Sequence, residues 1–432
     1  MKTLRILIIS FISPVIFSTL FAQDEFMNPL VKGLNKEKPH ASYRIDDDRI
    51  EPLDGPWRFT CLTNQDELPR GFYLDSYDPS GWDILDVPAY IDLPEDESGK
   101  NTGKEIAVFI RDFEMSVPEG GQQLILRFDG VTPAFHAWIN GFMIGYSEGF
   151  GIPAEFNITP FIKDGKNRLA VKVYRKDARP GSFFYKRDRL AGIYDHVSII
   201  KRSPVHVRDL VVENYFNEAL TEVLVRVKVF FISFLMEGNT GRTIEVTLLS
   251  PEQEELFKEQ QQLNFPVSVR QEIEMNFDFN LPNPDLWSPG EPGLYTLQIG
   301  ITETDSKTAE TITSRFGIRH FEKSDSLMIL NGDTVIPVIA EQPGMGYDYT
   351  LDQADYINYF LENGYNTLKI YDPLPDRIMD ILETNGILVW SVWPDEDALH
   401  DPSGISPELR RALEYQRGYR FQKDINRAGV DH

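Results

Sequence analysis

Short, alternating runs of apolar and polar residues dominate the chain from residue 23 to residue 204. Residues 123–128 (QLILRF) and 167–173 (NRLAVKV) are clear examples. A period of two directs one side of each segment toward a core, so this pattern predicts β-strands. Asn140 and Gly141 separate two apolar runs, and this pair tolerates the positive φ angles of a tight hairpin turn. We therefore predict a β-sandwich that contains a hairpin at Asn140 and Gly141.

A second strand-rich stretch follows over residues 205–318. Its clearest alternating segments are residues 222–229 (EVLVRVKV) and 243–249 (TIEVTLL). About 110 residues with this pattern fit an immunoglobulin-like sandwich. We predict a second, separate β-domain here.

The period changes again over residues 319–432, where apolar runs alternate with helical patterns. Residues 335–340, 365–370 and 387–392 are predicted as buried strands, and residues 352–363 and 375–384 as helices between them. Alternating strands and helices imply parallel pairing with right-handed crossovers. The pattern leaves two architectures open, a doubly wound sheet and an eightfold barrel.

Helix ends in this last region carry their own signals. Gly364 and Gly386 follow the two predicted helices at positions where a left-handed residue is favoured. A third, charged helix is predicted over residues 407–424, with Ser406 as its N-cap and Pro407 in its first turn.

The first 22 residues resemble an export signal. Lys2 and Arg5 precede an apolar run over residues 6–17, and Ala22 marks a small-residue cleavage point. An uncleaved anchor is the alternative, but the run is short for a span of about 20 residues and contains Pro14. We expect cleavage after Ala22, a periplasmic or secreted protein, and no membrane attachment after cleavage.

The composition of the chain excludes several classes of partner and cofactor. The 432 residues carry a formal net charge of −24, which repels phosphate backbones, so we expect no nucleic acid partner. Cys61 is the only cysteine, which excludes an internal disulfide. The seven histidines show no His-x-x-x-His spacing, so we predict neither a metal site nor a cofactor.

Several motifs resemble those of glycoside hydrolase family 2, and in particular of its bacterial β-galactosidases. They are residues 53–59 (LDGPWRF), residues 82–88 (WDILDVP), the run 135–173, residues 191–197 (AGIYDHV) and residues 287–297 (WSPGEPGLYTL). Taken by themselves these residues have structural roles, with Trp57 and the other motif tryptophans, Trp82 and Trp138, as core anchors.

The resemblance implies a mostly β, multidomain architecture. After a signal peptide at residues 1–22, it implies a jelly-roll sugar-binding domain over residues 23–204 and an immunoglobulin-like sandwich over residues 205–318. Residues 319–432 would then begin a (β/α) barrel. A closed barrel needs roughly 250 residues, so the segment present would be an incomplete barrel.

The same resemblance implies an exported enzyme that hydrolyses terminal β-linked sugars. Retaining glycosidases use two carboxyl groups about 5 to 5.5 Å apart. The family carries both on later barrel strands, so we assign no catalytic residue and expect the chain by itself to be inactive. The alternatives are a non-catalytic carbohydrate-binding protein, or pseudoenzyme, and a scaffold that uses only the sandwiches. The specific sugar and the oligomeric state stay open.

Candidate substrate-binding residues lie at the expected carboxyl ends of the barrel strands. Lys369 and Asp372 replace an arginine and a histidine of the family pattern, and Asn101 lies in a turn that resembles a loop reaching the active site. Carboxylates at these ends would bind sugar hydroxyls and the aromatic rings would stack on a sugar, or the same residues form a solvated acidic rim. The remaining candidates are Glu341, Tyr371, Trp390, Trp393 and Asp395, with Glu396 beside them.

Overall fold

The computed structural model describes most of the chain in ten segments. They are residues 31–92, 106–149, 151–174, 190–235, 239–265, 270–302, 308–324, 327–341, 353–370 and 374–392, together with Glu25, Asn28, Gln422, Asp424, Asn426, Arg427, Val430 and Asp431. The expected signal segment lies outside the described residues. The expected helix over residues 407–424 also lies outside them, except for the helical residues Gln422 and Asp424.

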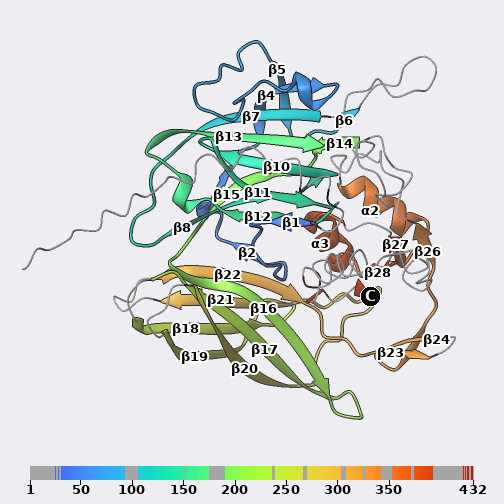
Figure 1. Cartoon of the computed structure of the whole chain (residues 1–432). Helices are drawn as coiled ribbons and strands as arrows, with labels where there is room; N and C mark the ends of the chain where they lie inside the picture. The colour runs from blue at the N-terminus through green and yellow to red at the C-terminus, as the bar shows by residue number, and fades with distance from the viewer. Residues whose placement is uncertain are drawn as a thin grey trace, which may run out of the picture.

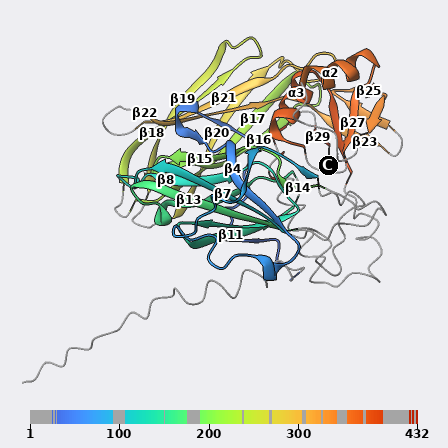
Figure 2. The same cartoon turned by 90° about the horizontal axis from the view of Figure 1, so that it is seen from above.

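Two β-sandwiches and one α/β segment make up the described chain, with the α/β segment beside both sandwiches (Figure 1). In the view from above, α2, α3 and β27 again lie together at one side of the strands (Figure 2). The prediction of a mostly β, multidomain fold is therefore confirmed.

The first sandwich packs a seven-stranded sheet against a four-stranded sheet. The larger sheet has the order β1 (Gly33–Leu34), β11 (Phe142–Glu148), β10 (Ala134–Ile139), β13 (Gly165–Tyr174), β7 (Ile106–Met115), β4 (Gly55–Leu62) and β5 (Asp83–Val87). The smaller sheet has the order β12 (Ala154–Asn157), β8 (Gln123–Phe128), β15 (Val197–Arg202) and β3 (Ile50–Pro52). A short third sheet joins β6 (Ile91–Asp92), β14 (Leu190–Ile193) and β9 (Val131–Thr132).

The core of the first sandwich follows the predicted alternation. Phe109, Leu126 and Val171 are fully buried between the sheets. The hairpin between β10 and β11 is confirmed, with φ of 50° at Asn140 and 89° at Gly141. Among the motif tryptophans, Trp57 and Trp138 are buried and Trp82 packs against the cluster around Trp138, as expected of core anchors.

The second sandwich has a three-stranded and a five-stranded sheet. The first contains β16 (Val205–Phe216), β17 (Glu222–Ser233) and β20 (Gln271–Pro282). The second has the order β19 (Glu255–Phe265), β18 (Asn239–Leu249), β21 (Tyr295–Thr302), β22 (Thr308–Phe316) and β2 (Arg44–Ile45). Apolar side chains at alternate positions, such as Val225, Val227 and Phe277, fill the space between the sheets.

Residues 31–49, which we term the N-terminal arm, run along both sandwiches. β1 pairs with β11 of the first sandwich, and β2 pairs with β22 of the second. The buried ion pair between Lys32 and Glu148, with Nζ and Oε1 2.8 Å apart, fixes the start of the arm. The arm therefore adds an edge strand to a sheet in each domain.

The α/β segment contains the predicted parallel sheet. β26 (Ile339–Glu341), α2 (Gln353–Glu362), β27 (Thr367–Ile370), α3 (Asp376–Thr384) and β28 (Leu388–Ser391) follow in order. The three strands are parallel, and β29 (Val430–Asp431) adds a fourth beside β28. Gly364 and Gly386 have φ of 70° and 68°, as predicted for residues that end helices.

The predicted strand over residues 335–340 is present only in part. Its first residue ends β25 (Asp333–Val335), the last strand of an antiparallel meander with β23 (Phe321–Ser324) and β24 (Leu327–Leu330). The parallel strand β26 begins only at Ile339. Pro337 between them has no N–H to donate to a neighbouring strand. Ile336 is accordingly 77% exposed instead of buried.

Candidate functional site

Four residues form a row across the carboxyl ends of the parallel strands. Glu341 pairs in register with Lys369, Lys369 with Trp390, and Trp390 with Asp431. We call these four residues the strand-end row. Its members come from β26, β27, β28 and β29, which follow one another across the sheet.

The row lies on the side of the sheet turned away from the helices. The intervening positions Ala340, Leu368 and Val389 pack with residues of α2 and α3 in one apolar core. Successive side chains of a strand point to opposite faces, so Glu341, Lys369 and Trp390 share the other face. This alternation is why the sequence exposes a charged pair and an indole next to a buried core.

Two residues of the row, Lys369 and Glu341, form an ion pair. The Nζ atom of Lys369 lies 3.6 Å from Oε1 of Glu341. The Glu341 side chain is 66% exposed, and Trp390 is 39% exposed. A carboxylate accepts hydrogen bonds, an ammonium group donates them, and an exposed indole offers an apolar face. Together these groups match a sugar ring, which has hydroxyls at its rim and apolar C–H faces.

The structure brings together three of the predicted binding residues. Glu341, Lys369 and Trp390 lie in neighbouring strands as the sequence indicated. The other predicted binding residues lie outside the described residues: Asn101, Tyr371, Asp372, Trp393 and Asp395, and also Glu396. Asp431 joins the row without having been predicted, because β29 was not recognised as a fourth strand.

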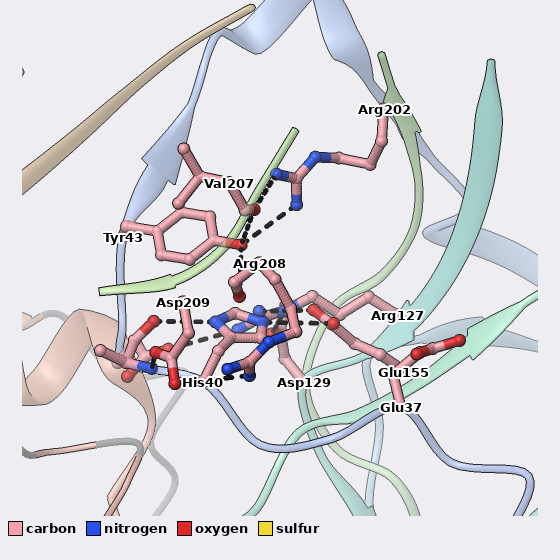
Figure 3. Close-up of polar contacts among 12 residues, drawn as sticks. Glu37, His40, Tyr43, Arg127, Asp129, Glu155, Arg202, Val207, Arg208 and Asp209 are labelled. Atoms are coloured by element: carbon pink, nitrogen blue, oxygen red, sulfur yellow. Dashed lines mark hydrogen bonds and ion pairs between the residues drawn. The ribbon is translucent and has the colours of Figure 1, made fainter. Parts of the chain in front are cut away.

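A second polar cluster lies where the N-terminal arm, the first sandwich and α3 meet (Figure 3). Arg127 of β8 contacts Asp129 (Nε to Oδ1, 2.6 Å), Glu155 of β12 (Nη1 to Oε1, 2.9 Å) and Asp376 of α3 (Nη2 to Oδ2, 3.3 Å). His40 of the arm contacts the second oxygen of Glu155 at 3.2 Å. The cluster therefore connects three separate parts of the chain.

Burial and pairing shift the acidities in this cluster. Burial alone would raise the pKa of Glu155, but His40 and Arg127 together lower it far below its usual value. Burial alone would lower the pKa of His40, but the Glu155 carboxylate raises it above its usual value. Glu155 is therefore held ionised beside a histidine that gains a proton more readily than usual.

No pattern in the sequence predicted this cluster. Arg127 interrupts the apolar run of β8 and occupies a position where a charge would face water in an isolated sandwich. The arm and α3 cover that position, so its side chain is only 17% exposed. A charged residue inside an otherwise apolar strand was the available signal, and its partner 249 residues away could not be inferred from local pattern.

A buried ion pair also connects the two sandwiches. Arg202 at the end of β15 contacts Glu310 of β22 through two hydrogen bonds, of 3.2 Å from Nε and 2.7 Å from Nη2. Its Nη1 atom also contacts the Tyr43 hydroxyl of the arm, as Figure 3 shows. Both charged side chains are at most 7% exposed. The orientation of one sandwich on the other is therefore fixed by a desolvated contact.

Neither a metal site nor a membrane-spanning helix is found in the ten described segments. No group of three or more His, Cys, Asp or Glu side chains there is arranged to hold a metal ion. No helix in the same segments is long and apolar enough to cross a membrane.

Known sequences are similar to this chain over most of its length. A β-galactosidase of Clostridium acetobutylicum is 27% identical over 346 residues, which are 72% of this chain and 37% of that protein. A β-galactosidase large subunit of Lactobacillus helveticus is 25% identical over 82% of this chain and 60% of its own length. The chain thus spans less than two thirds of these relatives.

Solved structures share the fold. The β-glucuronidase of Bacteroides uniformis superposes with a TM-score of 0.74 at 19% identity, covering 88% of this chain and 46% of that one. A glycosyl hydrolase family 2 member from Bacteroides cellulosilyticus gives a TM-score of 0.70, also at 19% identity, over 88% of this chain and 52% of its own.

Family patterns match both sandwiches. The sugar binding domain of glycosyl hydrolases family 2 matches residues 50–203, and a second domain of the same family matches residues 205–319. The two matches cover most strands of the first and of the second sandwich, respectively. The chain belongs to glycoside hydrolase family 2.

Proposed function

We propose that this chain forms the carbohydrate-binding part of an exported glycoside hydrolase that cleaves terminal β-linked sugars, with β-galactosides as its substrates. The strand-end row carries the proposal, because it combines an exposed indole with a donor and an acceptor at the end of a parallel sheet where barrel enzymes bind their substrates. Family membership and the names of the similar sequences support the substrate class.

The row is assigned to binding and not to bond cleavage. Its two acidic residues, Glu341 of β26 and Asp431 of β29, belong to strands that lie three positions apart in the sheet, so their backbones are about 14 Å apart at ~4.8 Å per strand. Retaining hydrolysis needs two carboxyl groups about 5 to 5.5 Å apart, and inverting hydrolysis about 6.5 to 9.5 Å. The proposal therefore attributes hydrolysis to barrel residues other than this row.

Isothermal titration of the full chain with methyl β-galactoside tests the binding role. Trp390→Ala removes the apolar face and should weaken binding at this site about tenfold, which corresponds to the loss of roughly 60 Å² of apolar contact. Phe142→Ala is the matched control, because Phe142 is an aromatic residue of 51% exposure on the first sandwich. Equal affinity in both variants would refute the assignment.

A non-catalytic carbohydrate-binding protein is the second candidate. The observation that favours it is the ion pair between Lys369 and Glu341, two groups at the strand ends whose opposite charges cancel. Assays with a chromogenic β-galactoside separate the two functions. Binding without turnover by the gene's full product supports the second candidate, and turnover supports the first.

Export is tested separately. We propose that the mature chain begins at Gln23, so N-terminal sequencing of protein recovered from the periplasm or medium should give Gln-Asp-Glu. Recovery of the chain in the cytoplasm with Met1 retained would contradict export.

A further inference from the structure

A cavity of about 400 Å³ lies at the junction of the N-terminal arm, the first sandwich and α3. Its walls include His40 and Ile45 of the arm, Arg127 of β8, His196 just before β15, and Arg377 of α3. We call it the junction pocket. None of the strand-end row residues lines it. Its volume lies in the range of about 300 to 1,000 Å³ that is typical of small-molecule sites.

One part of the wall is apolar. Ile45, Ile50 and Pro52 line the pocket, and Pro153 and Pro375 add further apolar surface. Ile50 retains 36% of its surface although it belongs to the strand β3. An apolar wall beside a few convergent polar groups is the usual composition of a ligand site.

The polar wall consists of charged residues in opposite pairs. Asp129 contacts Arg127 at 2.6 Å, and Asp195 contacts Arg377 at 2.7 Å. His196 Nδ1 lies 2.5 Å from Asp54 Oδ2. Each of these three carboxylates thus has a basic neighbour, so none of the three requires a charged ligand to balance it.

This pairing selects a particular ligand chemistry. Carboxylates only accept hydrogen bonds and guanidinium groups only donate them. A hydroxyl group does both, so adjacent hydroxyls of one molecule can bond to a carboxylate and to its basic partner at the same time. A neutral molecule with several neighbouring hydroxyls and an apolar face can therefore hydrogen-bond to the charged wall of the pocket and pack against its apolar wall.

His196 is the clearest recognition residue. Asp54 holds its Nδ1 atom, and another oxygen of the same carboxylate accepts a hydrogen bond from the Val197 N–H at 2.9 Å. The imidazole is 58% exposed, and its Nε2 atom has no hydrogen-bond partner among the described residues. The ring is thus fixed in orientation with one nitrogen available to a ligand.

We propose that the junction pocket binds a neutral mono- or disaccharide, with His196 and Asp129 as the residues that contact its hydroxyls. This site goes beyond the function proposed for the strand-end row, because it is built from different residues. Its walls come from the arm, the first sandwich and α3, so an occupied pocket would also stabilise their association.

The test uses the Trp390→Ala chain, in which binding at the strand-end row is weakened about tenfold. Titration with methyl β-galactoside and with a β-linked disaccharide should still show one saturable site whose affinity for at least one of the two sugars is the same as in the unmodified chain. Adding His196→Ala should weaken that site at least tenfold. Adding His320→Ala instead should leave it unchanged; His320 is a partly exposed histidine that also lies near a carboxylate, 3.4 Å from Glu322, but outside the pocket.

Thermal melting checks that each variant folds, and Asp129→Asn provides a second pocket variant of nearly unchanged size. The proposal is overturned if the Trp390→Ala chain binds neither sugar, or if neither pocket variant lowers its affinity. A different result would refute sugar binding at the strand-end row. In that case the Trp390→Ala chain would bind the same number of sugar molecules as the unmodified chain, with the same affinity.

Discussion

In the two sandwiches, large apolar side chains are enclosed between pairs of sheets, whereas in the α/β segment α2 and α3 cover only one face of the parallel sheet. Phe109 and Phe277 have no exposed surface. In contrast, Ile339 and Trp390 on the face away from the helices are 39% exposed. The sandwiches thus bury their apolar side chains between their own sheets. On that face of the parallel sheet, Leu388 packs with Trp287, but the carboxyl end that carries the candidate binding residues stays exposed.

The difference shows how stability and function are divided along the chain. The sandwiches orient one another through a buried ion pair, and the arm adds a strand to each. The α/β segment is attached through contacts such as that between Trp287 Nε1 and the carbonyl of Glu383, at 3.0 Å. We expect substitutions in the sandwiches to affect the global fold, and substitutions in the α/β segment to act locally.

The largest expected effect comes from the ion pair between the sandwiches. Arg202→Met leaves the Glu310 carboxylate buried without its partner and should lower the free energy of unfolding by about 3 to 5 kcal/mol. Urea denaturation measures this change. Arg226→Met is the matched control, because Arg226 makes a similar two-bond contact with Asp278 on an exposed surface. Equal midpoints for the two variants would contradict the role of burial.

A smaller and local effect is expected in the α/β segment. Leu382 of α3 is fully buried, and Leu382→Ala should cost about 2 to 5 kcal/mol within that segment. Limited proteolysis should then cut the α/β segment faster while both sandwiches stay protected. Leu361→Ala in α2 should change little, since Leu361 is 50% exposed. Simultaneous loss of the sandwiches would show that the segments unfold as one unit.

The smallest effect concerns pH at the contact between the arm and the first sandwich. The raised pKa of His40 gives stability that is fully present below its unfolded value of about 6.5 and is lost as pH rises through the folded value. The lowered pKa of Glu155 gives stability that is present above about 4.3 and is lost as pH falls through the folded value.

The two contributions therefore overlap most strongly between about pH 4.3 and pH 6.5. His40→Gln should lower the free energy of unfolding more at pH 5.5 than at pH 8.5. Urea midpoints at the two pH values measure the difference. A loss that is independent of pH would show that His40 acts through packing alone.

Local pattern predicted most of the elements but few of the contacts between them. The hairpin at Asn140 and the helices after residue 352 followed from turn chemistry and periodicity. The strand expected over residues 335–340 is interrupted at residues 336–338, because Pro337 in this apolar run has no N–H to donate to a neighbouring strand. β29 was not predicted because a strand of two residues is too short to show an alternation of apolar and polar positions.

The candidate site was predicted where it depends on strand ends and missed where it depends on docking. Glu341, Lys369 and Trp390 lie side by side because parallel strands end together. The junction pocket has no such local signature. It joins residues as far apart in sequence as His40 and Arg377, which only the packing of separate segments brings together.

The most direct test of sugar binding at the strand-end row is fluorine NMR of the full chain labelled with 5-fluorotryptophan. The chain has six tryptophans, and Trp390→Phe identifies the resonance of Trp390. Methyl β-galactoside should shift that resonance in a saturable manner and leave those of the buried Trp57 and Trp287 in place. A Trp390 resonance that does not move at saturating sugar would contradict the account.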